Sequence, residues 1–390
     1  MTAETKVFLK PKEDRRIRSG SLWIFSNEIQ RIEGKDDKGS LVQVFDSFGR
    51  SIGFGYLNRH SLIAIRMLSF CEFESLEALV HERLAAALSL RARLGYQSVY
   101  RLLFGESDFL PGLVVDRFDS LFVLESFSAG ADVLLPIAAE LLRKDFGAET
   151  IIENSDSHWR EYEGVPPQKR ILYGSVAEHR IAVGGISYII NHLDAQKTGF
   201  FLDQRENRLG IERYVQGLRV LDCCSNDGGF ALHAARGGAS RVDGIDVSAR
   251  AVEQANRNAA LNELPTARFT KGDVFDVLPR LNKDDYDMII LDPPAFVKSR
   301  NRIASGLKGY QKLNELALRA LSDNGVLVTC SCSQHVNEAL FVDMLNRAAR
   351  AQKKQLRIIG ISGASPDHPV LGTMPETRYL TCVTCFVSPL

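Results

Sequence analysis

The sequence predicts a mixed α/β protein whose C-terminal part is a Rossmann-like, doubly wound parallel sheet. Three observations support this fold class. Between residues 218 and 292, short apolar strands alternate with helical segments, as in parallel sheets. Residues 1–72 are instead rich in short strands and turns, which predicts a small β-barrel. Residues 73–190 mix strands with helices, so we expect three domains, the last one spanning residues 191–390.

The barrel region carries a candidate RNA-binding feature near its start. Strands are expected near residue 8 and over 41–45, 51–57 and 62–66. The first eighteen residues, which include Arg15 and Arg16, hold three more basic than acidic side chains, and Trp23 and Phe25 follow. Basic residues beside exposed aromatic rings can bind RNA by charge and stacking. The alternative is that both rings belong to the barrel core.

The central region gives a clear structural pattern and no chemical one. Apolar spacing predicts a helix over residues 74–95, a hairpin over 113–125 that turns at 118–120, a helix over 133–144 and a strand over 150–153. Its titratable residues have no spacing that indicates a site. We expect a spacer or a module that shapes the substrate site.

A strand-turn-helix unit in the C-terminal region indicates a ligand site. Residues 219–222 form an apolar strand that ends at Asp222, and a helix is expected to open at Gly228. In the turn, Cys224 and Asn226 occupy places where S-adenosylmethionine sites usually have glycine. Asn tolerates a left-handed backbone, whereas Cys224 is not an expected replacement. The alternative is an ordinary strand-to-helix connection.

Three carboxylates follow successive predicted strands. Asp246 ends a strand at 241–246, Asp273 follows a strand at 267–270, and Asp292 ends a strand at 287–292. The carboxyl ends of parallel strands share one edge of the sheet, where ligands bind. Asp246 is placed to accept the ribose hydroxyl protons of a bound adenosine. Ser248 is the expected N-cap of the next helix.

Two further segments are expected to line this edge. Residues 196–205 keep Lys, Asp, Gln and Arg together without a helical or strand period, as loops at binding sites often do. The alternative is a connector whose Phe200, Phe201 and Leu202 pack under the sheet. Residues 297–312 contain five basic residues and no acidic one, which favours a phosphate-bearing substrate. Helices are expected over 312–321 and 337–351, with a strand over 326–333 between them.

The Asp292-Pro-Pro sequence and Cys332 together suggest a reaction. Asp-Pro-Pro at a strand end presents a carboxylate and fixed carbonyls to a flat ring. If the strands before Asp292 and Cys332 are neighbours, the thiol and the carboxylate face the same site. The thiolate would add to carbon 6 of a pyrimidine, which makes carbon 5 nucleophilic enough to accept a methyl group. Cys330 is expected to be a buried structural cysteine.

Composition limits the remaining classes. The chain has 390 residues, equal numbers of basic and acidic residues, and seven cysteines. Cys382 and Cys385 lie in an alternating strand, where they face opposite sides, so no metal site is expected. The chain lacks a run of ~20 apolar residues and a signal-peptide profile. We therefore expect a cytoplasmic protein with no membrane partner.

The motifs at 196–205, Asp292–Phe296 and Ser331–Ser333, after the opening at Gly20–Ser26, resemble the bacterial 23S ribosomal RNA large-subunit methyltransferase I family over the whole chain. The resemblance implies a PUA RNA-binding domain, a central α/β domain and a class I methyltransferase domain. It also implies S-adenosyl-L-methionine as cofactor, 23S rRNA as partner and 5-methylcytosine as product, with Cys332 at the nucleophile position. The family's Ser-Tyr-Thr-Gly-Gly is replaced here at residues 225–229, so that Asp227 either repels the donor's carboxylate or binds its amine.

These patterns define the expected site. Cys332 and Asp292 are the expected catalytic residues. The expected RNA-binding residues are Arg15, Arg16, Lys298, Arg300, Arg302 and Lys308. The expected cofactor-binding residues are Phe201, Asp203, Gln204, Arg205, Asp222, Ser225, Asn226, Gly228, Gly229, Phe230, Asp246, Val247, Asp273, Val274, Asp292 and Pro293.

Other functions stay open at this point. The same fold could methylate a base nitrogen through Asp292-Pro-Pro, with Cys332 as packing. A PUA-type RNA-binding protein whose methyltransferase-like domain no longer turns over is a second alternative. A dehydrogenase is disfavoured because the G-x-G-x-x-G pattern is missing. A homodimer is also left open.

Overall fold

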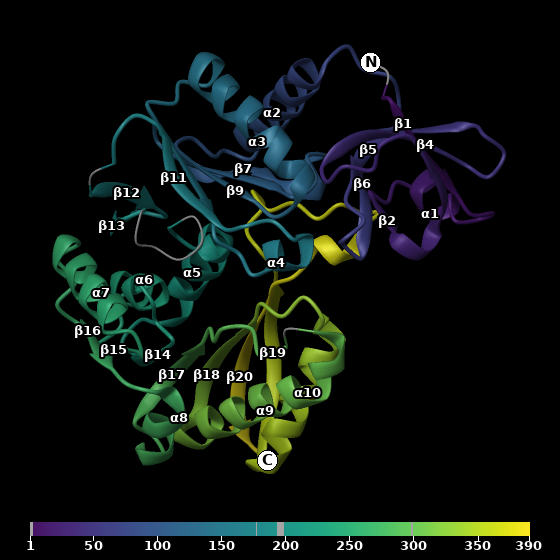
Figure 1. Ribbon diagram of the computed structural model, residues 1–390. Helices are drawn as coiled ribbons and strands as arrows, with labels where there is room; N and C mark the ends of the chain where they lie inside the picture. Colours follow the sequence, from purple (N-terminus) through teal and green to yellow (C-terminus); the bar gives the residue numbers. More distant parts are fainter. Residues whose placement is uncertain (1–2, 177, 193–198, 298) are drawn as a thin grey trace. The chain divides into compact units, whose positions relative to one another are not determined.

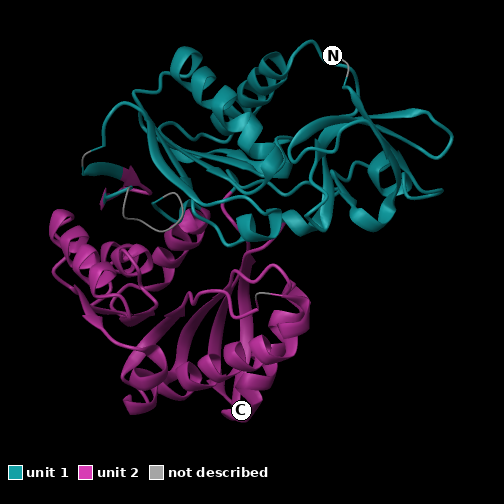
Figure 2. Ribbon diagram, viewed as in Figure 1, with its two compact units in different colours: residues 1–181, 190–202, 366–377 teal, residues 182–189, 203–365, 378–390 magenta. Residues whose placement is uncertain are grey.

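The computed structural model describes residues 3–176, 178–192, 199–297 and 299–390 (Figure 1). The chain forms two compact units (Figure 2). Unit 1 consists of Met1–Ile181, Ile190–Leu202 and Pro366–Thr377. Unit 2 consists of Ala182–Ile189, Asp203–Ser365 and Arg378–Leu390. The α/β fold class expected from the sequence is confirmed.

The N-terminal part of unit 1 is a six-stranded sheet with the order β2-β6-β5-β4-β1-β3. Its pairs are antiparallel except for β1 and β4, which run parallel. A core of buried aliphatic residues, among them Val7, Ile24 and Ile65, fills this part. Its elements are β1 (Thr5–Leu9), α1 (Arg15–Arg18), β2 (Trp23–Phe25), β3 (Ile29–Glu33), β4 (Ser40–Phe45), β5 (Ser51–Leu57) and β6 (Ile63–Ser69).

The second part of unit 1 is a five-stranded sheet with the order β11-β10-β9-β8-β7, against which α2 and α3 pack. The hairpin expected at 118–120 is confirmed, since β8 ends at Phe118 and β9 begins at Leu121. Ser75 and Ser128 cap the two helices with their side chains. The elements are α2 (Leu76–Arg93), β7 (Val99–Phe104), β8 (Leu113–Phe118), β9 (Leu121–Ser126), α3 (Ala129–Asp145), β10 (Thr150–Ser155), α4 (Trp159–Glu163) and β11 (Gln168–Tyr173).

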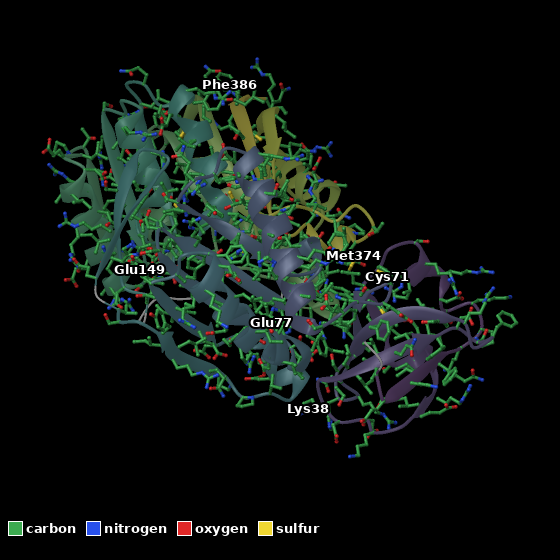
Figure 3. All side chains as sticks on the ribbon, turned by 90° about the horizontal axis from the view of Figure 1, so that it is seen from above. Lys38, Cys71, Glu77, Glu149, Met374 and Phe386 are labelled. Atoms are coloured by element: carbon green, nitrogen blue, oxygen red, sulfur yellow. The ribbon has the colours of Figure 1, made fainter. Side chains whose placement is uncertain are left out.

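The segment Pro366–Thr377 lies far along the chain and yet belongs to unit 1. Met374, labelled in Figure 3, is 1% exposed and packs in the core of the six-stranded sheet, where its sulfur accepts the Leu22 N–H at 3.3 Å. Asp367 is fully buried and accepts the backbone N–H of Arg101 at 2.9 Å. These bonds explain why the chain returns to unit 1 before its last strand.

Unit 2 is built on a seven-stranded sheet with the order β16-β15-β14-β17-β18-β20-β19. The first five strands are parallel to one another, and β20 runs antiparallel to both of its neighbours, β18 and β19. This is the doubly wound sheet expected from the sequence. Its strands are β14 (Arg219–Cys223), β15 (Arg241–Asp246), β16 (Ala267–Lys271), β17 (Tyr286–Leu291), β18 (Leu321–Ser331), β19 (Lys354–Ser362) and β20 (Thr381–Pro389).

The helices of unit 2 form two groups, in which α5 and α7 contact α6, and α8 and α10 contact α9. Ser248 caps α7 by accepting the Ala251 N–H at 3.2 Å, as expected. Figure 1 shows the two groups flanking the strands. The helices are α5 (Arg205–Ile211), α6 (Gly229–Arg236), α7 (Ala249–Leu261), α8 (Val274–Val277), α9 (Ile303–Ala320) and α10 (Glu338–Ala351).

The limits expected for the helix after the basic segment are wrong. The helix expected over 312–321 begins nine residues earlier, at Ile303, and includes most of the basic segment. Ile303 and Leu307 pack against the core through the same face as Tyr310, and this apolar face was obscured by the intervening lysines and glycines. The following strand begins at Leu321 rather than 326 and ends at Ser331.

A two-stranded sheet of β12 (His179–Val183) and β13 (Ile186–Ile190) precedes the site segment of unit 2. Asn258 of α7 and Asn262, which follows the helix, hold β13, since their side-chain oxygens accept the N–H groups of Ile189 and Ser187. Across the described ranges, none of the helices has the length and apolar character that a membrane span requires.

Candidate active site

The strand ends of unit 2 bring the predicted acidic residues to one edge of the sheet. Asp246 ends β15, Asp273 lies two residues beyond β16, and Asp292 directly follows β17. Cys332 directly follows β18, the neighbour of β17. Because these strands are parallel, their carboxyl ends share one edge (Figure 1). The strands that precede Asp292 and Cys332 are therefore neighbours, as the proposed reaction requires.

The turn after β14 has the backbone of a glycine-rich turn with only one of the usual glycines. Cys224, Asn226 and Gly228 have φ values of 63°, 46° and 87°. These are the three positions at which the expected pattern has glycine after the acidic residue. Asn tolerates this conformation, whereas it costs about 1–2 kcal/mol for an ordinary L-residue such as Cys224. The site therefore holds a strained cysteine where glycine would be relaxed.

Gly228 is the position in this turn that cannot carry a side chain. A Cβ atom there would lie 2.8 Å from the Phe269 ring and 3.3 Å from Ala255 Cβ. We therefore expect Gly228→Ala to lower the free energy of unfolding by about 2 kcal/mol or more, because strain and overpacking add, and to weaken donor binding. Urea denaturation and donor titration calorimetry measure the two effects.

Gly210 offers the matched control for that substitution. It lies in α5, and nothing lies within 4 Å of a Cβ atom placed there. Gly210→Ala should stabilise the fold by about 0.5–1 kcal/mol through helix propensity and leave donor binding unchanged. Equal effects of both substitutions would contradict the account of the turn.

Asp246 is fixed by two backbone donors. Its Oδ2 accepts the Asn226 N–H at 3.0 Å and its Oδ1 accepts the Ser248 N–H at 2.9 Å. The first bond joins the carboxylate to the turn after β14. Asp273 caps α8 by accepting the Phe275 N–H at 2.8 Å. The next residue, Val274, is buried. Val247, by contrast, is 62% exposed.

Asp222 is a buried carboxyl group with one oxygen engaged. Its Oδ2 accepts the Ala231 N–H at 3.0 Å, whereas its buried Oδ1 has no hydrogen-bond partner among the residues that the structure describes. Burial, with Asp292 and Asp246 nearby, raises the pKa of Asp222 from its ordinary 3.8 to about 8. Burial likewise raises the pKa of Asp227 to about 6, against the attraction of Arg208 and Arg250. Both groups are suited to a positively charged ligand.

The raised pKa of Asp222 gives a stability prediction. Between pH 3.8 and about 8 the folded protein keeps a proton that the unfolded chain releases, so this group lowers the stability as pH rises. Asp222→Asn keeps the acceptor for Ala231 and removes the titration. We expect the variant to be more stable than wild type above pH 8 by more than about 1 kcal/mol, with a smaller or no gain near pH 4. Urea midpoints at the two pH values test this, and an equal gain at both would contradict it.

The segment before α5 brings one of its polar side chains to Asp292. Gln204 Nε2 donates to Asp292 Oδ1 at 2.9 Å, and Asn207 Nδ2 donates to Gln204 Oε1 at 2.6 Å. Asp203 accepts the Tyr379 hydroxyl at 2.6 Å, and Arg205 is buried. Phe201 belongs to unit 1 and Gln196 to Thr198 lie outside the described residues. Within unit 2, Gln204 thus joins this segment to the site.

Cys332 lies against the loop that follows Asp292. Its thiol is half-buried and donates to the Pro293 carbonyl oxygen at 3.8 Å. Next to it, Ser333 Oγ accepts the Val297 N–H at 3.2 Å and lies 2.9 Å from the hydroxyl of the fully buried Tyr310. Sequence reasoning missed Tyr310 and Ser333, although Tyr310 lies on the apolar face of α9. Through these two bonds, Ser333 connects the loop after β18 to the loop after β17 and to α9.

Cys330 is enclosed in the sheet, whereas Cys332 is half-buried. Cys330 is fully buried, it pairs across the sheet with Cys382, and a contact with Cys382 together with burial raises its pKa well above the ordinary range. A buried thiol with a raised pKa is unreactive. The structural role expected for Cys330 agrees with these observations.

The expected RNA-binding residues fall in both units. Arg300, Arg302 and Lys308 are exposed in unit 2, and Lys298 lies outside the described residues. In unit 1, Arg15 is exposed, whereas Arg16 pairs with Glu28 at 3.0 Å. Trp23 and Phe25 are half-buried: Trp23 packs against the core of the six-stranded sheet, and the Arg16 guanidinium lies 4.8 Å from the centre of the Phe25 ring.

The remaining expected cofactor residues belong to the turn and the first turn of α6. Ser225 is buried and its N–H donates to the Ile245 carbonyl at 3.0 Å. Gly229 lies against Arg208, and Phe230 is 3% exposed. Among the residues that the structure describes, no cluster of His, Cys, Asp and Glu could hold a metal ion.

Comparison with known proteins places the chain among methyltransferases. A PUA-like domain model matches residues 7–70 and a methyltransferase domain model matches residues 215–363. A protein from Streptococcus mutans assigned to the SAM-dependent methyltransferases has the same fold, with a TM-score of 0.83, 21% identity, and coverage of 99% of this chain and 100% of that one. The fold and the site define a class I S-adenosylmethionine-dependent methyltransferase with a PUA-like domain.

Curated relatives identify the family. The Ribosomal RNA large subunit methyltransferase I of Pseudoalteromonas translucida is 35% identical over 98% of this chain and 99% of its own length. The protein of the same name from Escherichia coli is 34% identical over 94% of this chain and 95% of its own. The chain belongs to the ribosomal RNA large subunit methyltransferase I family.

Proposed function

We propose that this protein transfers a methyl group from S-adenosylmethionine to carbon 5 of a cytosine in 23S ribosomal RNA, through a covalent bond between Cys332 and the base. The relatives' names support an rRNA substrate. The observation that carries the chemistry is the position of Cys332. Its thiol lies 3.8 Å from the carbonyl oxygen of Pro293, the residue next to Asp292, at the ligand edge of the sheet.

The described residues fit the donor. The positive-φ turn at 224–228 lets a ligand approach the backbone, and the N-terminus of α6 follows it. Asp246, fixed by two N–H groups, is placed for the ribose hydroxyls. The buried Oδ1 of Asp222, to which none of the described residues donates, and the carboxyl group of Asp227 suit the donor's ammonium group. Of the two roles left open for Asp227, binding the amine agrees better with this acidic surrounding.

The proposed steps use the residues around the thiol. The Cys332 thiolate adds to carbon 6 of the cytosine, and the electron pair of the 5,6 double bond makes carbon 5 nucleophilic. Asp292 holds the N3 and N4 edge and stabilises a proton on N3, which draws electrons from carbon 6. When bound, S-adenosylmethionine supplies an electrophilic methyl group to carbon 5. A base then removes the carbon-5 proton, the double bond re-forms and the thiolate leaves.

Nucleoside mass analysis of rRNA incubated with the protein and donor tests this function. The substrate is rRNA from cells that lack the protein. We expect 5-methylcytidine at one position after incubation and none at that position before it. N4-methylcytidine would instead support nitrogen methylation by Asp292-Pro-Pro. Titration calorimetry without any donor affinity would support an RNA-binding protein that has lost turnover.

A further inference from the structure

The short helix α4 of unit 1 buries two of its charged residues, Arg160 and Glu163, and exposes its aromatic ones. Arg160 is 1% exposed, and its guanidinium group donates to Asp132 at 2.7 and 3.0 Å and to the Ser126 carbonyl at 2.9 Å. Three residues on, the Glu163 carboxylate accepts bonds from Asn58 and Arg66, both at 2.8 Å. The hydrophobic effect alone would favour the opposite arrangement.

These ion pairs, each of which has its buried partner on α4, hold the helix between the two sheets of unit 1. Asn58 and Arg66 come from the six-stranded part, whereas Asp132 and Ser126 come from the five-stranded part. Such ion pairs fix the orientation of a helix, because breaking one leaves a buried charge without a partner. Bonds to both parts of unit 1 therefore fix the orientation of α4.

The outward face of α4 is an aromatic surface, formed by His158, Trp159 and Tyr162. Trp159 is 42% and Tyr162 66% exposed. The rings of His158 and Trp159 are 4.7 Å apart at 35°, and those of Trp159 and Tyr162 are 5.9 Å apart at 47°. The rings thus form a continuous surface on a fixed support. Exposed apolar clusters of this kind mark interaction sites.

Lysines flank the aromatic surface. Lys38, labelled in Figure 3, donates to the Gly164 carbonyl at the end of α4 at 2.6 Å. Lys169 is exposed on β11, the edge strand that follows α4. They balance the exposed carboxylates of Asp156 and Glu161, so the surface is close to neutral. Binding there must rely on the rings more than on charge.

We propose that the aromatic surface of α4 stacks unpaired bases of the RNA substrate, outside the methyl-transfer site. This inference rests on the proposed rRNA substrate. Aromatic rings stack bases of any sequence, and the flanking lysines can neutralise the adjacent phosphates. A protein partner is disfavoured because a five-residue helix is about 8 Å long, whereas a stable protein interface buries about 800 Å² on each partner.

RNA binding by the full-length protein tests the proposal, with a single-stranded rRNA fragment as probe. The double variant Trp159→Ala/Tyr162→Ala should bind about 10-fold more weakly or worse. The slope of log affinity against log salt should not change, because stacking releases no counterions. Lys38→Gln/Lys169→Gln should lower that slope by up to about 2. In methyl transfer, the ring variant should raise KM for RNA and leave kcat unchanged.

Leu94→Ala is the matched control, since Leu94 is 45% exposed at the end of α2 in the same unit. Its RNA affinity should equal that of wild type. An RNA affinity of the ring variant equal to that of wild type would overturn the proposal. Because affinity is measured without turnover, this outcome is distinct from an absence of methyl transfer, which would contradict the proposed function instead.

Fluorescence gives a direct second readout, because Trp23 and Trp159 are the two tryptophans of the chain. In a Trp23→Phe background, the emission comes from Trp159 and should be quenched when a base stacks on the indole. Unchanged emission at saturating RNA would overturn the proposal. Sedimentation showing a wild-type dimer that the ring variant dissociates would overturn it as well, in favour of a contact between two copies.

Discussion

Replacing Cys332 by alanine is expected to lower the rate of methyl transfer by at least about 10³-fold, because removal of a covalent nucleophile costs several powers of ten. Donor binding should be unchanged, since the acidic groups proposed to contact the donor lie on β14, β15 and their turns. Single-turnover transfer of labelled methyl groups to rRNA measures the rate, and calorimetry measures donor affinity.

Cys330→Ala is the control for that substitution. Cys330 lies two residues away, is fully buried and faces Cys382 across the sheet. The change should lower stability modestly through a small cavity and leave most of the activity. If Cys332→Ala were as active as Cys330→Ala, the covalent mechanism would have to be abandoned.

Replacing Asp292 by alanine is expected to have the second largest effect, a loss of about 10²-fold or more in kcat, the range of general acid–base contributions. The carboxylate stabilises the N3 proton that activates carbon 6, and Gln204 holds it in place with a bond of 2.9 Å. Single-turnover rates across a pH series measure the loss.

Replacing Asp292 by asparagine tests whether the charge of the side chain is needed, because the two side chains have nearly the same shape. Asp292→Asn keeps an oxygen that can accept the Gln204 bond, but it cannot stabilise a protonated N3. We expect it to be nearly as slow as the alanine variant. Gln204→Ala, which removes the bond to Asp292 and the bond from Asn207 but keeps the carboxylate, should cost much less. An Asn variant with wild-type rates would assign Asp292 a packing role only.

The sequence predicted most of the sheet that carries the site. Strands that alternate with helices and end in carboxylates are visible from periodicity alone, and the structure places Asp246, Asp273 and Asp292 at one edge. N-caps such as Ser248 were predictable for the same local reason. The family resemblance, carried by the motifs around Asp292 and Cys332, agrees with the relatives at 34–35% identity.

What the sequence did not reveal depends on contacts between distant residues. Cysteine does not favour a positive φ, so the conformation of Cys224 could not be predicted from its residue type. It follows from the turn after β14, which is bonded to Asp246 through the Asn226 N–H. The hydrogen bond between Tyr310 and Ser333 joins α9 to the loop after β18, and no local sequence pattern links these two residues. The exposed rings of α4 are recognisable only once Arg160 and Glu163 are seen to be buried.

A trapped adduct tests the central claim most directly. With RNA that carries 5-fluorocytosine, fluorine cannot leave carbon 5 as a proton does, so the enzyme should stay bound to the base after methyl transfer. Mass spectrometry of the digested complex should find the methylated fluorocytosine attached to the peptide that contains Cys332. Complete turnover without an adduct, or an adduct on another cysteine, would contradict the account.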